Sequence, residues 1–128
     1  MDYNLKIMSI EQENPETKKL IAAKPRDFKF KPGQALLVSI NKPGLKDDKR
    51  LIAATSLNSD YYLELLFPEL KYDRFTENLC KTKAGEDITI FDAAGTLEYK
   101  GKGIFIALES GILRFIAMFR QLKQDENL

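Results

Sequence analysis

Few side chains in this sequence could perform chemistry, because the chain has no histidine and one cysteine. Without histidine there can be no Ser-His-Asp triad, no Cys-His dyad and few kinds of zinc site, so we expect no metal centre. Cys80 cannot form an internal disulfide, which fits a reducing compartment. Any reaction would depend on carboxylates, lysines, tyrosines, this thiol or a bound cofactor.

Glu109 is the sharpest candidate for acid-base catalysis, because it follows an apolar run and precedes an amphipathic segment. At the rim of an apolar cleft, desolvation would raise the pKa of its carboxyl group and suit it to act as a general base. In the first turn of a helix, the same carboxylate would instead complement the helix dipole, which lowers its pKa. The sequence leaves both interpretations open.

Composition and charge describe an ordinary folded protein. The 128 residues are 44% hydrophobic and 30% charged, and 20 basic residues are matched by 19 acidic ones. This balance gives no electrostatic basis for binding nucleic acid or a membrane surface. The N-terminal residues do not resemble a signal peptide, and no apolar stretch is long enough for a membrane span. We therefore expect a soluble, cytoplasmic protein.

Short strand patterns separated by Gly, Pro and Asn turn signals dominate the first part of the chain. Their regular spacing predicts an all-β fold, a closed six-stranded antiparallel (Greek-key) barrel. Phe75 and Leu79 share a face at helical spacing, so a short helix over 74–81 should cap the barrel. The expected strands cover residues 3–10, 17–23, 35–40, 50–57, 61–67 and 87–91.

The C-terminal part has a different pattern. Residues 103–108 form a continuous apolar run, which is typical of a buried parallel strand. An amphipathic helix should follow, with apolar residues three and four positions apart from Ile112 to Leu122. A strand followed by a helix is how an α/β domain begins, so we expect a strand–helix appendage to the barrel.

Four stretches, in order along the chain, resemble the ferredoxin/flavodoxin reductase family. The clearest is Phe-Lys-Phe-Lys-Pro-Gly-Gln over 28–34, which matches the family's aromatic-x-Pro-Gly-Gln turn; the others cover 50–56, 76–86 and 95–107. The resemblance implies a flavin-binding barrel over 1–100, which would hold FAD or FMN at its rim. It also implies that residues 101–128 are the remnant of a truncated nucleotide-binding domain.

The flavin-binding motif is altered in this sequence. The family carries an aromatic residue that stacks on the isoalloxazine ring and then a Ser or Thr that donates a hydrogen bond to it, where this chain has Ile52 and Ala53. Arg50 and Thr76 match the positions that touch the flavin phosphates. Arg74, however, stands where a glycine is expected and could fill the space of a phosphate.

The glycine-rich turn of the nicotinamide site is altered too. Of the family's three glycines only Gly111 remains, so we expect no nicotinamide binding. In the family fold both altered segments face the flavin cleft, and this concentration of changes suggests an engineered cleft rather than random decay. The redesigned cleft would contain small and medium aliphatic residues: Leu51, Ile52, Ala53, Ala54, Leu108 and Leu113.

Three functions follow from this pattern. The leading hypothesis is an engineered, flavin-free barrel whose cleft binds a small molecule or a protein partner, with Glu109 as the base if the cleft is catalytic. The alternative is a remnant flavoprotein that still binds FAD or FMN through Arg50 and Thr76 and transfers electrons. The third is an interaction module, including a homodimer formed through the C-terminal helix.

Overall fold

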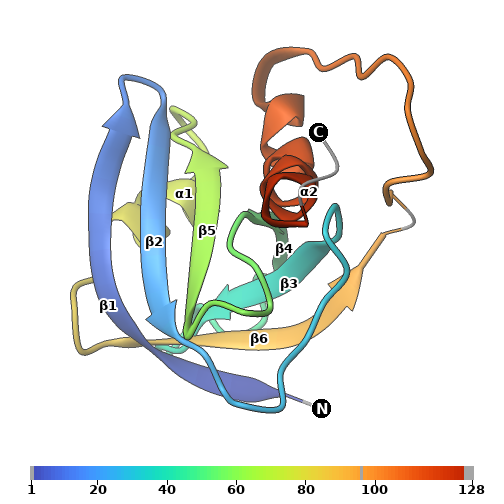
Figure 1. Cartoon of the computed structure of the whole chain (residues 1–128). Coiled ribbons are helices and arrows are strands. Elements are labelled where there is room, and N and C mark those ends of the chain that lie inside the picture. Colours follow the sequence, from blue (N-terminus) through green and yellow to red (C-terminus); the bar gives the residue numbers. More distant parts are fainter. Residues whose placement is uncertain (1, 96, 126–128) are drawn as a thin grey trace.

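The computed structural model describes residues 2–95 and 97–125, which form a closed barrel with two α-helices against it (Figure 1). Hydrogen-bonded neighbours are all antiparallel and follow the closed order β1-β2-β5-β4-β3-β6. The predicted six-stranded antiparallel barrel is therefore confirmed. Its strands are β1 (Tyr3–Asn14), β2 (Thr17–Ala23), β3 (Ala35–Ile40), β4 (Arg50–Ala54), β5 (Tyr62–Pro68) and β6 (Asp87–Ala94).

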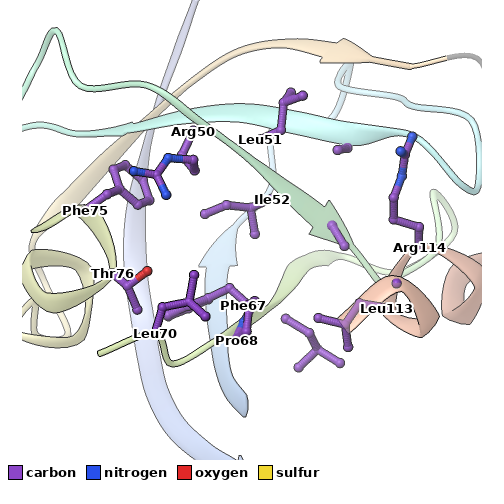
Figure 2. A pocket seen from close by; sticks show the side chains of 14 residues that line it. Arg50, Leu51, Ile52, Phe67, Pro68, Leu70, Phe75, Thr76, Leu113 and Arg114 are labelled. Atoms are coloured by element: carbon purple, nitrogen blue, oxygen red, sulfur yellow. The ribbon is translucent and has the colours of Figure 1, made fainter. Parts of the chain in front are cut away.

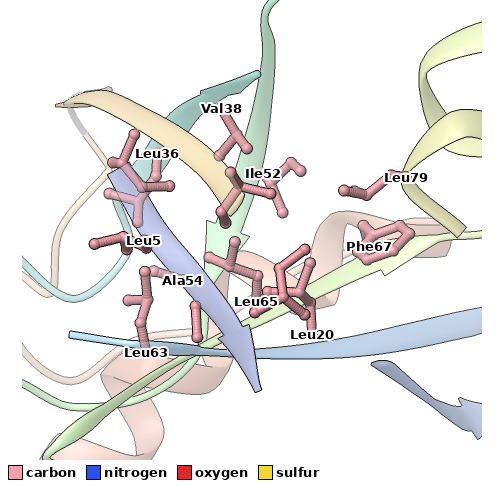
Figure 3. Packing of buried hydrophobic residues seen from close by; sticks show 14 of the residues in the cluster. Leu5, Leu20, Leu36, Val38, Ile52, Ala54, Leu63, Leu65, Phe67 and Leu79 are labelled. Atoms are coloured by element: carbon pink, nitrogen blue, oxygen red, sulfur yellow. The ribbon is translucent and has the colours of Figure 1, made fainter. Parts of the chain in front are cut away.

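Inward-pointing aliphatic side chains fill the barrel (Figure 3). Because successive side chains of a strand point to opposite faces, Leu63 and Leu65 of β5 enter this core while Glu64 and Leu66 point outward. Glu64 and Leu66 are nevertheless buried, because the C-terminal helix covers this side of the barrel. The most buried core residues, each at most 3% exposed, include Leu5, Leu20, Leu36, Val38, Leu63, Leu65, Ile88 and Ile90.

The first helix, α1 (Arg74–Cys80), caps one end of the barrel as the sequence predicted. Phe75 and Leu79 are both buried, and both belong to the barrel core. Cys80 packs partly buried against the same core, and burial raises the pKa of its thiol. A thiol with a raised pKa is a poor nucleophile, so Cys80 is best explained as a packing residue.

The second helix, α2 (Leu113–Gln124), packs against the outer side of β4 and β5 and follows a short 3-10 turn, η1 (Glu109–Ile112). The Arg120 guanidinium donates hydrogen bonds to the Glu64 carboxylate at 2.6 Å and to the Thr55 carbonyl at 2.8 Å. Side-chain hydrogen bonds, of which those of Arg120 are the shortest, and an apolar stripe thus attach α2 to the barrel. The buried residues of that stripe are Leu113, Ala117, Met118 and Leu122.

The strand expected over 103–108 is wrong. After β6 the chain makes an irregular excursion beside the barrel before it reaches α2 (Figure 1), and Ile104, Ile106 and Leu108 are 92%, 78% and 82% exposed. A parallel strand needs a neighbour to bond its N–H and C=O groups, and no described strand pairs with this segment. The division of the chain at residue 100 stays a prediction.

The outer face of α2 is less exposed than the sequence suggested. The Phe105 ring packs edge-on against Phe115 and Phe119, with ring centroids 5.4 and 5.1 Å apart, and Tyr99 stacks on Phe105. The irregular segment thus covers part of the helix, although Ile112 stays 45% exposed. Homodimerisation through this helix stays a prediction.

Gly33, in the turn before β3, determines how closely α2 can approach the barrel. Its φ is 103°, and a Cβ there would overlap Met118 Cε and lie 2.6 Å from the Leu97 carbonyl oxygen. We expect Gly33→Ala to lower the free energy of unfolding by about 2–3 kcal/mol in urea denaturation, through both strain and overlap. Gly85→Ala is the control, because Gly85 has a φ of 95° but open space around it, and strain alone should cost about 1 kcal/mol. Equal losses in the two variants would contradict the packing role of Gly33.

Candidate functional site

An apolar cleft of about 320 Å³ lies where β4, the end of β5, α1 and the start of α2 meet (Figure 2). On β4, Leu51 and Ala53 point to the outside of the barrel, while Ile52 belongs to the barrel core and also lines the cleft. The lining residues are Ala35, Arg50, Leu51, Ile52, Ala53, Leu66, Phe67, Pro68, Leu70, Phe75, Thr76, Gly111, Leu113 and Arg114.

The structure brings together most residues that the sequence assigned to this cleft. Leu51, Ile52 and Ala53 come from β4, and Leu113 reaches them from α2, where it packs against Ala53 and Leu66. The two altered segments of the sequence therefore do meet across one cleft. Arg50 and Thr76 line the same cleft, beside α1.

Three other assigned residues are not placed in the cleft. Ala54 is 1% exposed and belongs to the barrel core, because strand alternation turns it to the opposite side from Ala53. Leu108 lies on the irregular segment, outside the cleft and 82% exposed. Glu109 begins η1, but its side chain lies outside the described part of the structure, so its role as a base stays a prediction.

Asp73 joins Arg50 to Thr76. The Arg50 guanidinium donates two hydrogen bonds to the Asp73 carboxylate, at 3.0 and 3.1 Å, and also lies 5.1 Å from the ring centroid of Phe75. The same carboxylate is the N-cap of α1 and accepts hydrogen bonds from the backbone N–H and the hydroxyl of Thr76. Asp73 thus lies between Arg50 and Thr76 and is hydrogen-bonded to both.

These contacts shift the pKa values of Asp73 and Arg50 in the directions that favour their charged forms. Hydrogen bonds from Arg50 and Thr76 lower the pKa of Asp73 from 3.8 to about 2. The same carboxylate raises the pKa of Arg50 above its usual value. Sequence reasoning missed Asp73, although an aspartate directly before a short helix is a strong N-cap signal.

Arg114, the second residue of α2, stands at the opposite end of the cleft from Arg50 (Figure 2). Its Nε donates a hydrogen bond of 3.2 Å to the Gly33 carbonyl oxygen. No aspartate or glutamate is among the described residues that line the cleft, and Thr76 supplies its one hydroxyl. No local sequence pattern indicates Arg114, since its position depends on how α2 docks.

Residues 2–95 and 97–125 show neither a metal-binding cluster nor a membrane-spanning helix. No group of three or more Cys, Asp or Glu side chains there is arranged to hold a metal ion. Among the described helices, none has the length and apolar character needed to cross a membrane.

The closed barrel with its capping helix has the fold of the FAD-binding barrel of ferredoxin-NADP+ reductases. Ferredoxin NADP+ reductase from Neisseria gonorrhoeae, with bound FAD and NADP, superposes with a TM-score of 0.79 at 17% identity, covering 99% of this chain and 54% of that one. Ferredoxin-NADP+ reductase from Plasmodium falciparum gives a TM-score of 0.81 at 19% identity, covering 98% and 54%.

A more distant match is the cytochrome b5 reductase domain of Ulva prolifera nitrate reductase, with a TM-score of 0.66 at 12% identity, covering 80% of this chain and 44% of that one. No protein-family model and no curated protein matches the sequence. The chain spans about half the length of the solved reductases. At these identities the comparisons establish the fold alone.

The cleft residues do not fit a flavin seated as the family resemblance implies. Ile52 presents no aromatic face, and Ala53 has no hydrogen-bond donor on its side chain. The resemblance implies that Arg50 and Thr76 contact the flavin phosphates, but the ionised Asp73 carboxylate is already hydrogen-bonded to both residues and would repel a second anion. Arg50 also lies over the Phe75 ring, so this face of the ring is less available to stack on a flavin.

Proposed function

We propose that this chain is a reductase-type barrel whose cleft binds a small, mainly apolar molecule, and that it has lost flavin and nicotinamide binding. The observation that carries the proposal is the hydrogen-bonded set Arg50–Asp73–Thr76, in which an internal carboxylate already binds the two residues that the resemblance assigns to the flavin phosphates. That the change was made by design stays a prediction from the sequence pattern.

The cleft has the size and lining of a small-molecule site. Ligand pockets commonly have volumes of roughly 300–1,000 Å³ and apolar walls with a few polar groups, and this one has a volume of about 320 Å³. Its walls are mainly aliphatic and aromatic side chains from β4, β5, α1 and α2. A ligand that buries about 200 Å² of apolar surface there would gain on the order of 5 kcal/mol, before the entropic costs of binding.

Binding is better supported than catalysis. The described lining residues include no aspartate, glutamate, lysine, tyrosine or cysteine that could exchange a proton with a ligand. Glu109 would be the base if an activity were found, and Glu109→Gln should then abolish it.

The test is a titration with the neutral fluorescent probe N-phenyl-1-naphthylamine, alongside the visible spectrum of the purified protein. We expect saturable probe binding, no flavin absorption, and no flavin uptake with excess FAD or FMN. Leu51→Asp should weaken probe binding by at least about fivefold, because it places a charge on the apolar wall.

Leu108→Asp is the matched control, since Leu108 is also exposed but lies outside the cleft, and it should leave probe binding unchanged. Thermal unfolding of both variants checks that they are folded. A protein that is purified with flavin, or that takes it up with micromolar affinity, would overturn the proposal in favour of a remnant flavoprotein.

A further inference from the structure

We propose that the ligand of this cleft is an amphipathic carboxylate, with its apolar body between β4 and α2 and its anionic head on Arg114. This inference rests on the proposed function, because it assigns a ligand class to the same cleft. Two guanidinium groups stand at opposite ends of an otherwise apolar cavity (Figure 2), and they differ in whether their charge is already compensated.

The positive charge of Arg50 is compensated by a carboxylate of the protein itself. Both of its terminal nitrogens are hydrogen-bonded to the Asp73 carboxylate, and its side chain also lies over the Phe75 ring. An added anion at this end would meet the negative charge of Asp73, whose pKa is far below neutrality. The Arg50 end of the cleft therefore offers little to an anionic ligand.

Arg114 is not compensated by any acidic side chain that the structure describes. Its hydrogen bond is from Nε to the neutral Gly33 carbonyl, and no described carboxylate lies within 4.0 Å of its guanidinium. A guanidinium has five N–H donors, so the two terminal nitrogens are left to donate. The bond to Gly33 holds the group in place, so little side-chain entropy would be lost when a carboxylate binds.

The surroundings of Arg114 favour an ion pair with a ligand. Its side chain is half-buried where α2 meets the apolar wall formed by Ala53 and Leu113. A charge-assisted pair is stronger beside such a low-dielectric surface than in open water. Arg114 also borders a second hollow, which has one acidic and one further basic residue in its lining, Glu98 and Lys100. The positive end of the cleft is therefore Arg114.

The geometry of Arg114 and the size of the cleft both suit a carboxylate ligand. The planar guanidinium edge matches the two oxygens of a carboxylate, which it can bind with two parallel hydrogen bonds. A cavity of about 320 Å³ has room for a fused-ring or short-chain body but not for a dinucleotide. Arg114 would also have a structural role through Gly33, so the test must separate head-group recognition from helix docking.

The experiment uses two probes of nearly equal shape, 2-naphthoate and its neutral counterpart 2-naphthamide. Both are titrated by fluorescence into the full chain and into Arg114→Gln, Arg114→Lys and Lys123→Gln. Lys123 is an exposed cation at the last turn of α2, outside the cleft, and so is the matched control. Urea denaturation of each variant measures the structural role of the side chain separately.

For the unmodified protein we expect 2-naphthoate to bind at least about fivefold more tightly than 2-naphthamide, and this difference should shrink at high salt. Arg114→Gln should weaken 2-naphthoate by about tenfold and change 2-naphthamide by less than about twofold. Arg114→Lys should retain part of the preference for 2-naphthoate, because lysine keeps the positive charge but lacks the planar guanidinium that donates two parallel hydrogen bonds. Lys123→Gln should change neither affinity.

Equal affinities for the two probes in the unmodified protein would overturn the head-group assignment and leave the apolar site intact. So would an equal loss for both probes in Arg114→Gln, since that is the result of disturbed helix docking. Failure of both probes to bind the unmodified protein would overturn the proposed function together with this inference. If Arg114→Gln does not fold, the unmodified protein and Arg114→Lys still decide the question.

Discussion

Arg120→Met is expected to lower the free energy of unfolding by about 2 kcal/mol, because it leaves a nearly buried carboxylate without its partner. The Glu64 side chain is 9% exposed and lies 2.6 Å from Arg120 Nη1. Arg120 itself is 46% exposed, so the loss should be smaller than for a fully buried pair. Urea denaturation at neutral pH measures the change.

A double-mutant cycle with Glu64→Gln separates the ion pair from the packing of the Arg120 side chain. If the charge on Glu64 causes the loss, Arg120→Met should cost clearly less in the Glu64→Gln background, with a coupling energy of about 1–2 kcal/mol. Simple additivity of the two substitutions would show that the pair contributes nothing beyond side-chain packing.

The same substitution should also weaken binding in the cleft. Leu113 forms part of the cleft wall and is held there by α2, which Arg120 anchors to β5 and to Thr55. A neutral apolar probe should therefore bind less tightly to Arg120→Met than to the unmodified protein. Under the proposed function, this substitution would therefore change stability and ligand binding together, because both depend on the docking of α2.

Most of the barrel could be predicted from local sequence patterns. The limits of β2 and β3 follow from turn signals on both sides, such as the Lys31–Gly33 turn, together with β-favouring apolar residues between them. α1 follows from Phe75 and Leu79 at helical spacing. These features depend on residues close together in the chain, so the sequence carries them directly.

The conformation of residues 103–108 could not be predicted, because a short apolar run does not indicate which part of the structure packs against it. Phe105 packs on α2, whereas Ile104 and Ile106 stay exposed on either side of it. A buried strand would have required a neighbouring strand, which depends on tertiary structure rather than on the run itself. The expectation of a strand was therefore wrong.

The candidate site likewise contains residues that the sequence identified and residues that it did not. Ile52, Ala53 and Leu113 could be assigned through a family resemblance. Strand alternation turns both Ile52 and Ala54 toward the core, and only the packing around the cleft separates Ile52, which still lines it, from Ala54. The Arg50–Asp73 pair joins residues 23 positions apart. Arg114 reaches the cleft only because α2 folds back onto β4. Long-range contacts of this kind leave no local sequence signal.

Lowering the pH from 5 to 2 is expected to remove about 1–2 kcal/mol of stability through Asp73. Its pKa falls from 3.8 to about 2 on folding, because Arg50 and Thr76 hydrogen-bond to the ionised carboxylate. A group with a depressed folded-state pKa stabilises the fold above its unfolded pKa, and this contribution is lost as the pH falls through the folded value. Urea denaturation at a series of pH values measures it.

Asp73→Asn isolates the charge of this group, because asparagine is also a good N-cap for α1. The variant should lose the ion pair with Arg50 and show a flatter pH dependence below pH 4, whereas Asp73→Ala should lose the cap as well and cost about 1 kcal/mol more. Glu86→Gln is the control, since Lys42 and Lys83 also lower the pKa of that carboxylate, but on the open surface, and its loss should matter little. The flavin-free interpretation depends on Asp73 as the internal anion. A pH profile that is the same in Asp73→Asn as in the unmodified protein would mean that Arg50 is not paired with Asp73 in solution.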